Sequence, residues 1–136
     1  MINFNYESDF SLPDESHYSA WLSRVIESEG KTEGEINYIF CDDEYLHKIN
    51  LEYLKHDDLT DIISFDYSLG NQLSGDIFIS VERVSENAME YRATPEEELK
   101  RVMSHGLLHF CGYKDKSATE AELMRNKEEE KMKLFK

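Results

Sequence analysis

The sequence predicts an α+β domain: a single mixed β-sheet of about four strands with packed helices, one of which carries an HxxxH pattern. Two observations lead to this prediction. Strand-like and helix-like hydrophobic patterns follow one another as strand, helix, strand, helix, strand, strand and then helices. The two consecutive strand-like segments are separated by a gap too short for a helical crossover, so they should be antiparallel. At 136 residues, we expect 1–136 to form a single domain.

The first half of the chain contains two predicted strand–helix pairs. Residues 1–6 alternate weakly, and residues 35–41 (EINYIFC) are rich in β-branched and aromatic side chains, as in strands. A helix between them should end at Gly30, with apolar positions at helical spacing: Tyr18, Trp21, Leu22, Val25 and Ile26. A second helix, capped by Asp42 or Asp43, would use as its apolar positions Leu46, Ile49, Leu51 and Leu54.

The second half begins with two short predicted strands and continues as helices. DIISF (61–65) and GDIFIS (75–80) are the strands, and residues 81–92 continue helically. Thr94 opens a capping box with proline at the first helical position, and this helix should stop at Gly112. Ser117 opens a second capping box before a charged final helix.

The net charge of −14 restricts the functional classes. It argues against a nucleic-acid binder held by bulk electrostatics, because such binding depends on neutralising phosphates. It does not exclude a nucleic-acid enzyme with a local basic groove. Arg101 and other basic residues near His105 and His109 could contribute to such a groove. The acid is concentrated in the triplets 96–98 and 128–130, which we expect to be solvated helix faces.

The chain shows no targeting or membrane signal. Its first ten residues lack the basic and apolar regions of a signal peptide, and no apolar run approaches the roughly 18 residues needed to span a bilayer. Cys41 and Cys111 are far apart and have no CxxC spacing, as expected for two reduced thiols. We therefore expect a cytoplasmic protein with no membrane partner.

A metal site is predicted at the end of the helix that follows Thr94. His105 and His109 are four residues apart, which places two imidazoles on one helix face. The chain should turn at Gly112, after which the carboxylate of Asp115 can reach back toward the same point. Three ligands leave a fourth position open, as in catalytic zinc sites. We predict one Zn²⁺ bound by His105, His109 and Asp115, with the alternative that Asp115 caps the last helix.

Gly106 separates this helix from the zinc peptidases. In an HExxH enzyme the residue after the first histidine is a glutamate that takes a proton from the metal-bound water. Glycine cannot act as a base, so a conventional zinc peptidase is disfavoured. A close approach of backbone or simple packing would explain a glycine at this position.

Several stretches together resemble the YbeY family of bacterial endoribonucleases. HGLLHFCGYKD (105–115) is similar to the family signature HGxLHLxGYDH, TDIISF (60–65) to TDVLSF, and GDIFIS (75–80) to its GDIxI strand. Ile49-Asn50 with Tyr53 is similar to its LNxxYR segment. The resemblance implies a zinc-dependent, single-strand-specific endoribonuclease in ribosomal RNA maturation (16S processing, ribosome biogenesis and quality control). Its implied partners are ribosomal RNA and the ribosome or ribosomal proteins.

The chain departs from the family pattern at two positions. Asp115 stands where the family has its third zinc histidine, and a carboxylate is a competent ligand that can alter metal preference. Leu54 stands where the family has an arginine thought to help catalysis. The next residue, Lys55, can contact phosphate but cannot make a bidentate guanidinium contact. Lys55 and His56 are candidate catalytic residues, although their segment could equally be a solvated turn.

These residues suggest metal-assisted cleavage of RNA phosphodiester bonds. The metal would stabilise charge on a phosphate oxygen or lower the pKa of a bound water. The alternative is a non-catalytic ribosome-assembly factor that uses the metal to hold its fold, which the missing arginine and the acidic balance favour. A closed site with four protein ligands would identify the structural role, whereas a catalytic site keeps a water position.

Overall fold

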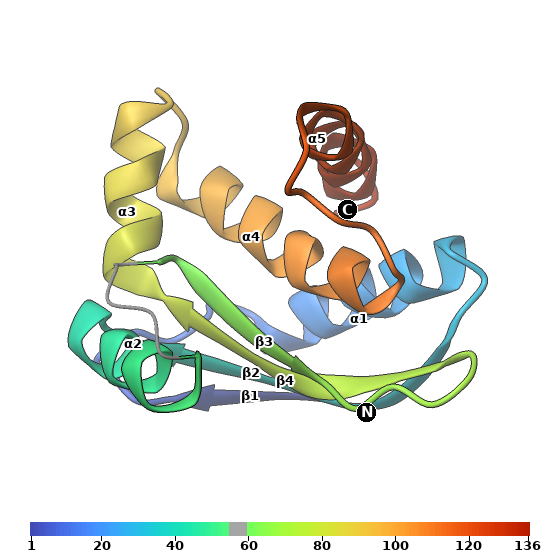
Figure 1. The fold of residues 1–136 in the computed structure, drawn as a ribbon, viewed down its shortest axis with the longest axis horizontal. Coiled ribbons are helices and arrows are strands. Elements are labelled where there is room, and N and C mark those ends of the chain that lie inside the picture. Colours follow the sequence, from blue (N-terminus) through green and yellow to red (C-terminus); the bar gives the residue numbers. More distant parts are fainter. Residues whose placement is uncertain (55–59) are drawn as a thin grey trace.

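The computed structural model describes residues 1–54 and 60–136, and within them a single four-stranded sheet (Figure 1). Its strands are β1 (Ile2–Tyr6), β2 (Thr32–Cys41), β3 (Ile62–Asp66) and β4 (Gln72–Ser80), in the order β1-β2-β4-β3. β1–β2 and β2–β4 are parallel and β3–β4 is antiparallel. The predicted α+β class and the antiparallel pair are confirmed.

The helices are α1 (Glu15–Ser28), α2 (Asp43–Ile49), α3 (Val81–Glu90), α4 (Pro95–Phe110) and α5 (Ala118–Met132). α1 and α4 lie over one face of the sheet, and α5 lies on the side of α4 away from the sheet (Figure 1). Both predicted capping boxes are present, at Thr94 and Ser117. Within the described residues, no helix is long and apolar enough to cross a bilayer.

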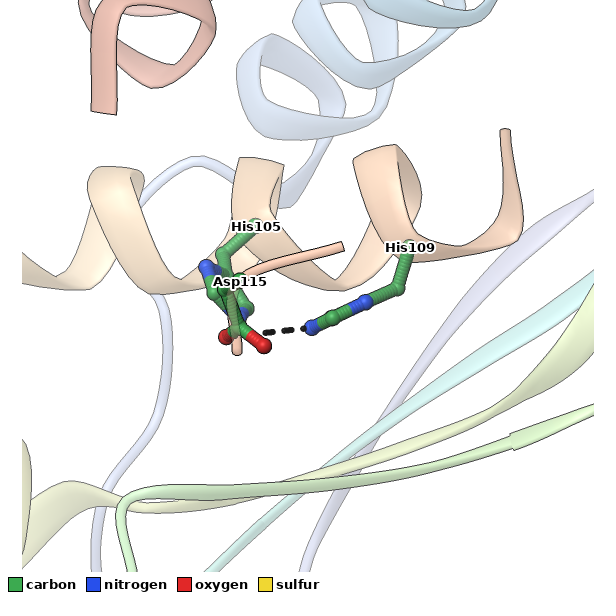
Figure 2. Close-up of side chains that lie close together, drawn as sticks. All are labelled: His105, His109 and Asp115. Carbon is green, nitrogen blue, oxygen red and sulfur yellow. Dashed lines mark ion pairs between the residues drawn. The ribbon is translucent and has the colours of Figure 1, made fainter. Parts of the chain in front are cut away.

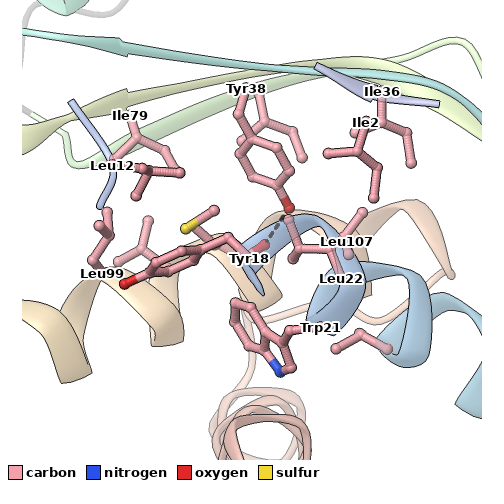
Figure 3. Close-up of a cluster of buried hydrophobic side chains, with 14 of the residues drawn as sticks. Ile2, Leu12, Tyr18, Trp21, Leu22, Ile36, Tyr38, Ile79, Leu99 and Leu107 are labelled. Carbon is pink, nitrogen blue, oxygen red and sulfur yellow. Dashed lines mark hydrogen bonds between the residues drawn. The ribbon is translucent and has the colours of Figure 1, made fainter. Parts of the chain in front are cut away.

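The main core lies between the sheet and helices α1 and α4 (Figure 3). Alternate residues of β2 and β4 point into it, because side chains alternate between the two faces of a strand. Tyr38 is fully buried there, and its hydroxyl donates a hydrogen bond to the carbonyl oxygen of Met103 at 2.8 Å. This contact joins the middle of the sheet to α4. A smaller cluster of Cys41, Leu46 and Ile63 covers part of the other face. Cys41 and Cys111 are both free thiols, as predicted.

One predicted apolar stripe is wrong. Leu51 and Leu54 were expected to continue the buried face of the second helix, but they are 43% and 41% exposed. The α-helical repeat ends at Ile49, and residues Asn50–Leu54 form a π-helical turn, η1. Since a π-turn is wider than an α-turn, the residues beyond Ile49 rotate away from the face that Leu46 buries.

Candidate metal centre

The two histidines lie side by side on the last turns of α4. Their ring centroids are 4.5 Å apart and the rings are nearly perpendicular. α4 places them there because its start is set by the Thr94 capping box and its end by Gly112, whose φ of 104° is open to glycine and strained for other residues. Both rings line a cavity of about 320 Å³ between α4, α5 and the start of β3.

Asp115 lies against both rings. Its Oδ2 is 3.2 Å from Nε2 of His105 and 3.5 Å from Nε2 of His109, and Figure 2 shows the three side chains converging. One donor atom from each residue lies within 4.8 Å of the others, close enough for one ion to contact all three. The cap of α5 is supplied by Ser117, whose Oγ accepts from the backbone N–H of Glu120 at 3.1 Å. Asp115 is therefore not needed as that cap.

The other nitrogen of each ring is engaged by the protein. Nδ1 of His105 donates to Oε2 of Glu128 at 2.6 Å, and Nδ1 of His109 donates to the carbonyl oxygen of Tyr113 at 3.0 Å. In the neutral rings these bonds leave both Nε2 atoms unprotonated and directed toward the Asp115 side of the pocket, the orientation that metal-binding histidines adopt. Burial disfavours the protonated ring of His105, but the hydrogen bond and charge of Glu128 outweigh it and raise its pKa.

Two acidic residues of the site contradict the prediction that both acidic triplets are solvated. Glu98 is 5% exposed and Glu128 is 6% exposed, because α5 packs along α4 and turns one acid of each triplet inward. Arg101 lies between them, with Nη1 3.2 Å from Oε1 of Glu128 and Nε 3.9 Å from Oε1 of Glu98. Arg101 thus reaches the pocket, as a local basic residue would, but its charge is already paired.

Asp61 brings a further carboxyl group to the same pocket from the start of β3. It accepts a weak hydrogen bond from the side chain of Asn87 at 3.4 Å. Burial raises the pKa of its carboxyl group. The charged lining of the cavity is therefore mostly acidic: Asp61, Glu98, Asp115, Glu128 and the paired Arg101.

Gly106 faces the sheet and not the metal pocket. A Cβ atom at this position would lie 2.9 Å from Cδ1 of Ile77 and 3.3 Å from Cδ1 of Ile62. The close packing of α4 on β3 and β4 therefore explains the glycine. A glutamate at 106 would therefore be directed at the side chains of Ile77 and Ile62, away from the metal pocket, and could not take the role of the HExxH base.

The remaining sequence candidates have different outcomes. Lys55 and His56 lie outside the described residues. Tyr113, which is not among the residues predicted for the site, is held by its hydroxyl, which donates to Oε1 of Glu29 at 2.7 Å, and by its carbonyl contact with His109. Glu128 was missed as a site residue, although its spacing from Met124 and Lys131 marks a helical stripe that a reading of the triplet as solvent-facing ignores.

Comparison with known proteins identifies the family of this chain. The family model described as "Endoribonuclease YbeY" matches residues 3–136. The chain belongs to the YbeY family. Among curated YbeY relatives, the protein named "Endoribonuclease YbeY" from Flavobacterium johnsoniae is 69% identical, over 99% of this chain and 97% of the relative. The one of the same name from Flavobacterium psychrophilum is 64% identical, over 99% and 96% of the two chains.

A solved structure shares the fold of this YbeY chain. The solution structure of TM1509 from Thermotoga maritima superimposes with a TM-score of 0.69 and covers 99% of this chain and 89% of the other. At 24% sequence identity, this likeness shows the fold alone.

Proposed function

We propose that this chain is a metal-dependent endoribonuclease that cleaves single-stranded RNA. The observation that carries the proposal is the convergence of His105, His109 and Asp115 in an open pocket of a chain whose relatives are named endoribonucleases. Zinc is the ion we propose, with one ion per chain. Three protein ligands and an open side toward the cavity are the arrangement of a catalytic zinc site.

The donor set fits a divalent metal ion. Two imidazole nitrogens and a carboxylate oxygen are ordinary zinc ligands, and both rings are held with Nε2 toward the same point. An ion bound there would supply a Lewis acid for a phosphate oxygen of the RNA. The acidic lining repels phosphates wherever no cation is bound, which makes the bound cation the attractive element for the substrate.

Most side chains of this pocket would hold the metal ion or position its ligands. A carboxyl group among them can also carry a proton. Gly106 supplies no base, so proton transfer falls to another group near the reacting phosphate. Asp61 lines the pocket, and its raised pKa brings a carboxyl group closer to the range in which it can exchange protons at working pH. We infer that Asp61 is a candidate proton carrier, beside Glu98, which lines the same pocket and whose pKa is also raised by burial.

The wider role we propose is maturation of ribosomal RNA, including 16S rRNA processing, in the cytoplasm and in contact with the ribosome or its proteins. The support is the resemblance of the motifs at 60–65, 75–80 and 105–115 to those of the family. We propose that residues 1–136 form the single domain that carries this activity.

The test of the function is cleavage of RNA by the purified protein before and after removal of its metal. We expect an unstructured RNA to be cut internally, a matched duplex to resist, chelation to abolish cutting and added Zn²⁺ to restore it. Activity that persists after complete metal removal would refute the proposal. A casein-type substrate tests whether the protein is instead a peptidase, and we expect it to stay intact.

The second candidate is a non-catalytic assembly factor stabilised by the metal, which is favoured by Leu54 at the family's arginine position. The two functions differ in metal coordination. X-ray absorption of the zinc-loaded protein should show three protein ligands and a bound water if the site is catalytic. Four protein ligands would favour the structural role.

Asp115→Ala is expected to lose most of its bound zinc, and Asp115→His is expected to keep it. Removing one of three donors should weaken binding by at least about 100-fold, since even outer partners of metal ligands are worth 10- to 100-fold. Elemental analysis of the purified variants beside His109→Ala is the measurement. Full zinc in Asp115→Ala with loss in His109→Ala would show that Asp115 is not a ligand.

A further inference from the structure

Helix α5 contacts one metal-site histidine directly. Oε2 of Glu128 receives the Nδ1–H of His105 at 2.6 Å, and Oε1 of Glu128 is 3.2 Å from Nη1 of Arg101. The Glu128 side chain is 7% exposed, so water does not compete strongly for these bonds. Glu128 therefore determines which nitrogen of His105 carries the proton and how its ring is turned.

The same helix reaches the second histidine through a chain of contacts. Lys131 of α5 is buried, and its Nζ is 2.6 Å from Oε2 of Glu29, at the end of α1. Oε1 of Glu29 accepts from the hydroxyl of Tyr113 at 2.7 Å, and the carbonyl oxygen of Tyr113 accepts from Nδ1 of His109 at 3.0 Å. Lys131 thus holds the turn that orients His109.

These polar contacts form much of the surface by which α5 is attached. Its buried residues are Met124, Glu128 and Lys131, and two of these three are the charged residues just described. The carbonyl of Lys131 also accepts from Nε1 of Trp21 at 2.8 Å. An amphipathic helix usually docks through an apolar stripe, whereas this helix docks largely through groups that also hold the histidines.

We propose that α5 is the element that positions both histidine rings, so that docking of α5 and metal binding are coupled. Glu128 acts on His105 directly, and Lys131 acts on His109 through Glu29 and Tyr113. The coupling is reciprocal: metal should stabilise docked α5 by the same factor by which docked α5 tightens metal binding. The inference rests on the metal site of the proposed function and adds positioning residues to it.

The experiment measures zinc affinity and backbone exchange, with no RNA present. Competition with a chromophoric chelator gives the Kd for Zn²⁺ of the wild type and of Glu128→Gln, Tyr113→Phe and Lys131→Met. Glu122→Gln, an exposed substitution on the same helix, is the matched control. We expect Glu128→Gln to raise the Kd at least about tenfold, Tyr113→Phe and Lys131→Met to raise it several-fold, and Glu122→Gln to leave it unchanged. Glu128→Asp should recover part of the loss.

Hydrogen exchange separates positioning from a merely structural role. In the wild type, Zn²⁺ should slow exchange of the α5 amides, and in Glu128→Gln this protection should shrink. Variants that lose thermal stability but bind Zn²⁺ with unchanged Kd would overturn the proposal. If only Glu128→Gln weakens binding, the claim for His109 is overturned and that for His105 stands. If Lys131→Met does not fold, the Kd of Tyr113→Phe tests the claim that α5 positions His109.

The outcome is independent of the RNA assay. Zinc affinity that depends on α5 in a protein without ribonuclease activity would support the coupling and refute the proposed function. Ribonuclease activity in a protein whose zinc affinity is unchanged by the α5 substitutions would support the proposed function and refute the coupling.

Discussion

Replacing both His105 and His109 with alanine is expected to remove the bound metal and to reduce RNA cleavage by at least about 100-fold, since outer partners of metal ligands alone are worth 10- to 100-fold. The two rings supply two of the three donor atoms of the site. Asp115 alone, at a partly exposed position, cannot hold a zinc ion against water. The measurements are zinc content and the initial rate of cleavage of an unstructured RNA.

The fold should survive this double substitution. The histidine side chains are 18% and 30% exposed and contribute little to the apolar core, so the sheet and its core should stay folded. Helix α5 should dock less tightly, because Glu128 loses its hydrogen bond to His105. His47→Ala, on α2 and outside the pocket lining, is the matched control and should cleave RNA at the wild-type rate. Equal cleavage by the double variant and the wild type would mean that the reaction takes place elsewhere on the protein.

Gly75→Ala is expected to lower the free energy of unfolding by about 3 kcal/mol, at the upper end of the cost of overpacking, or to prevent folding. Gly75 lies in the middle of β4, paired on one side with Ile36 and on the other with Asp66. A Cβ atom there would lie 2.3 Å from the backbone oxygen of Phe65 and 2.5 Å from Cζ of Phe110. β3 cannot move away without disturbing its pairing with β4, and the Phe110 ring can make room only by leaving its place in the core.

Urea denaturation of Gly75→Ala, followed by circular dichroism, is the measurement. Gly70→Ala is the control, because an added Cβ at Gly70 would meet nothing within 4 Å. Its backbone is in the left-handed region, with a φ of 58°. It should cost only the penalty of a left-handed residue, roughly 1–2 kcal/mol. A Gly75→Ala variant as stable as Gly70→Ala would show that β3 can shift to make room, contrary to the packing described above.

Most of the secondary structure could be predicted because its signals are local. The capping boxes at Thr94 and Ser117 and the stop at Gly112 depend on residues within four positions of each helix end. The π-helical turn at Asn50–Leu54 could not be predicted in this way. Leu51 and Leu54 continue an apolar helical pattern, and nothing local shows that the turn widens.

The site was predictable only as far as its residues are neighbours along the chain. His105 and His109 share a helix face by spacing alone, and Asp115 follows one glycine turn later, so the candidate ligands follow from residues that are close along the chain. The groups that hold these ligands come together only when the helices pack. Glu128, Arg101 and the Lys131–Glu29–Tyr113 contacts come from elements up to about a hundred residues apart. Their meeting depends on how α5 packs on α4 and α1, and a run of three glutamates carries no information about which one is turned inward.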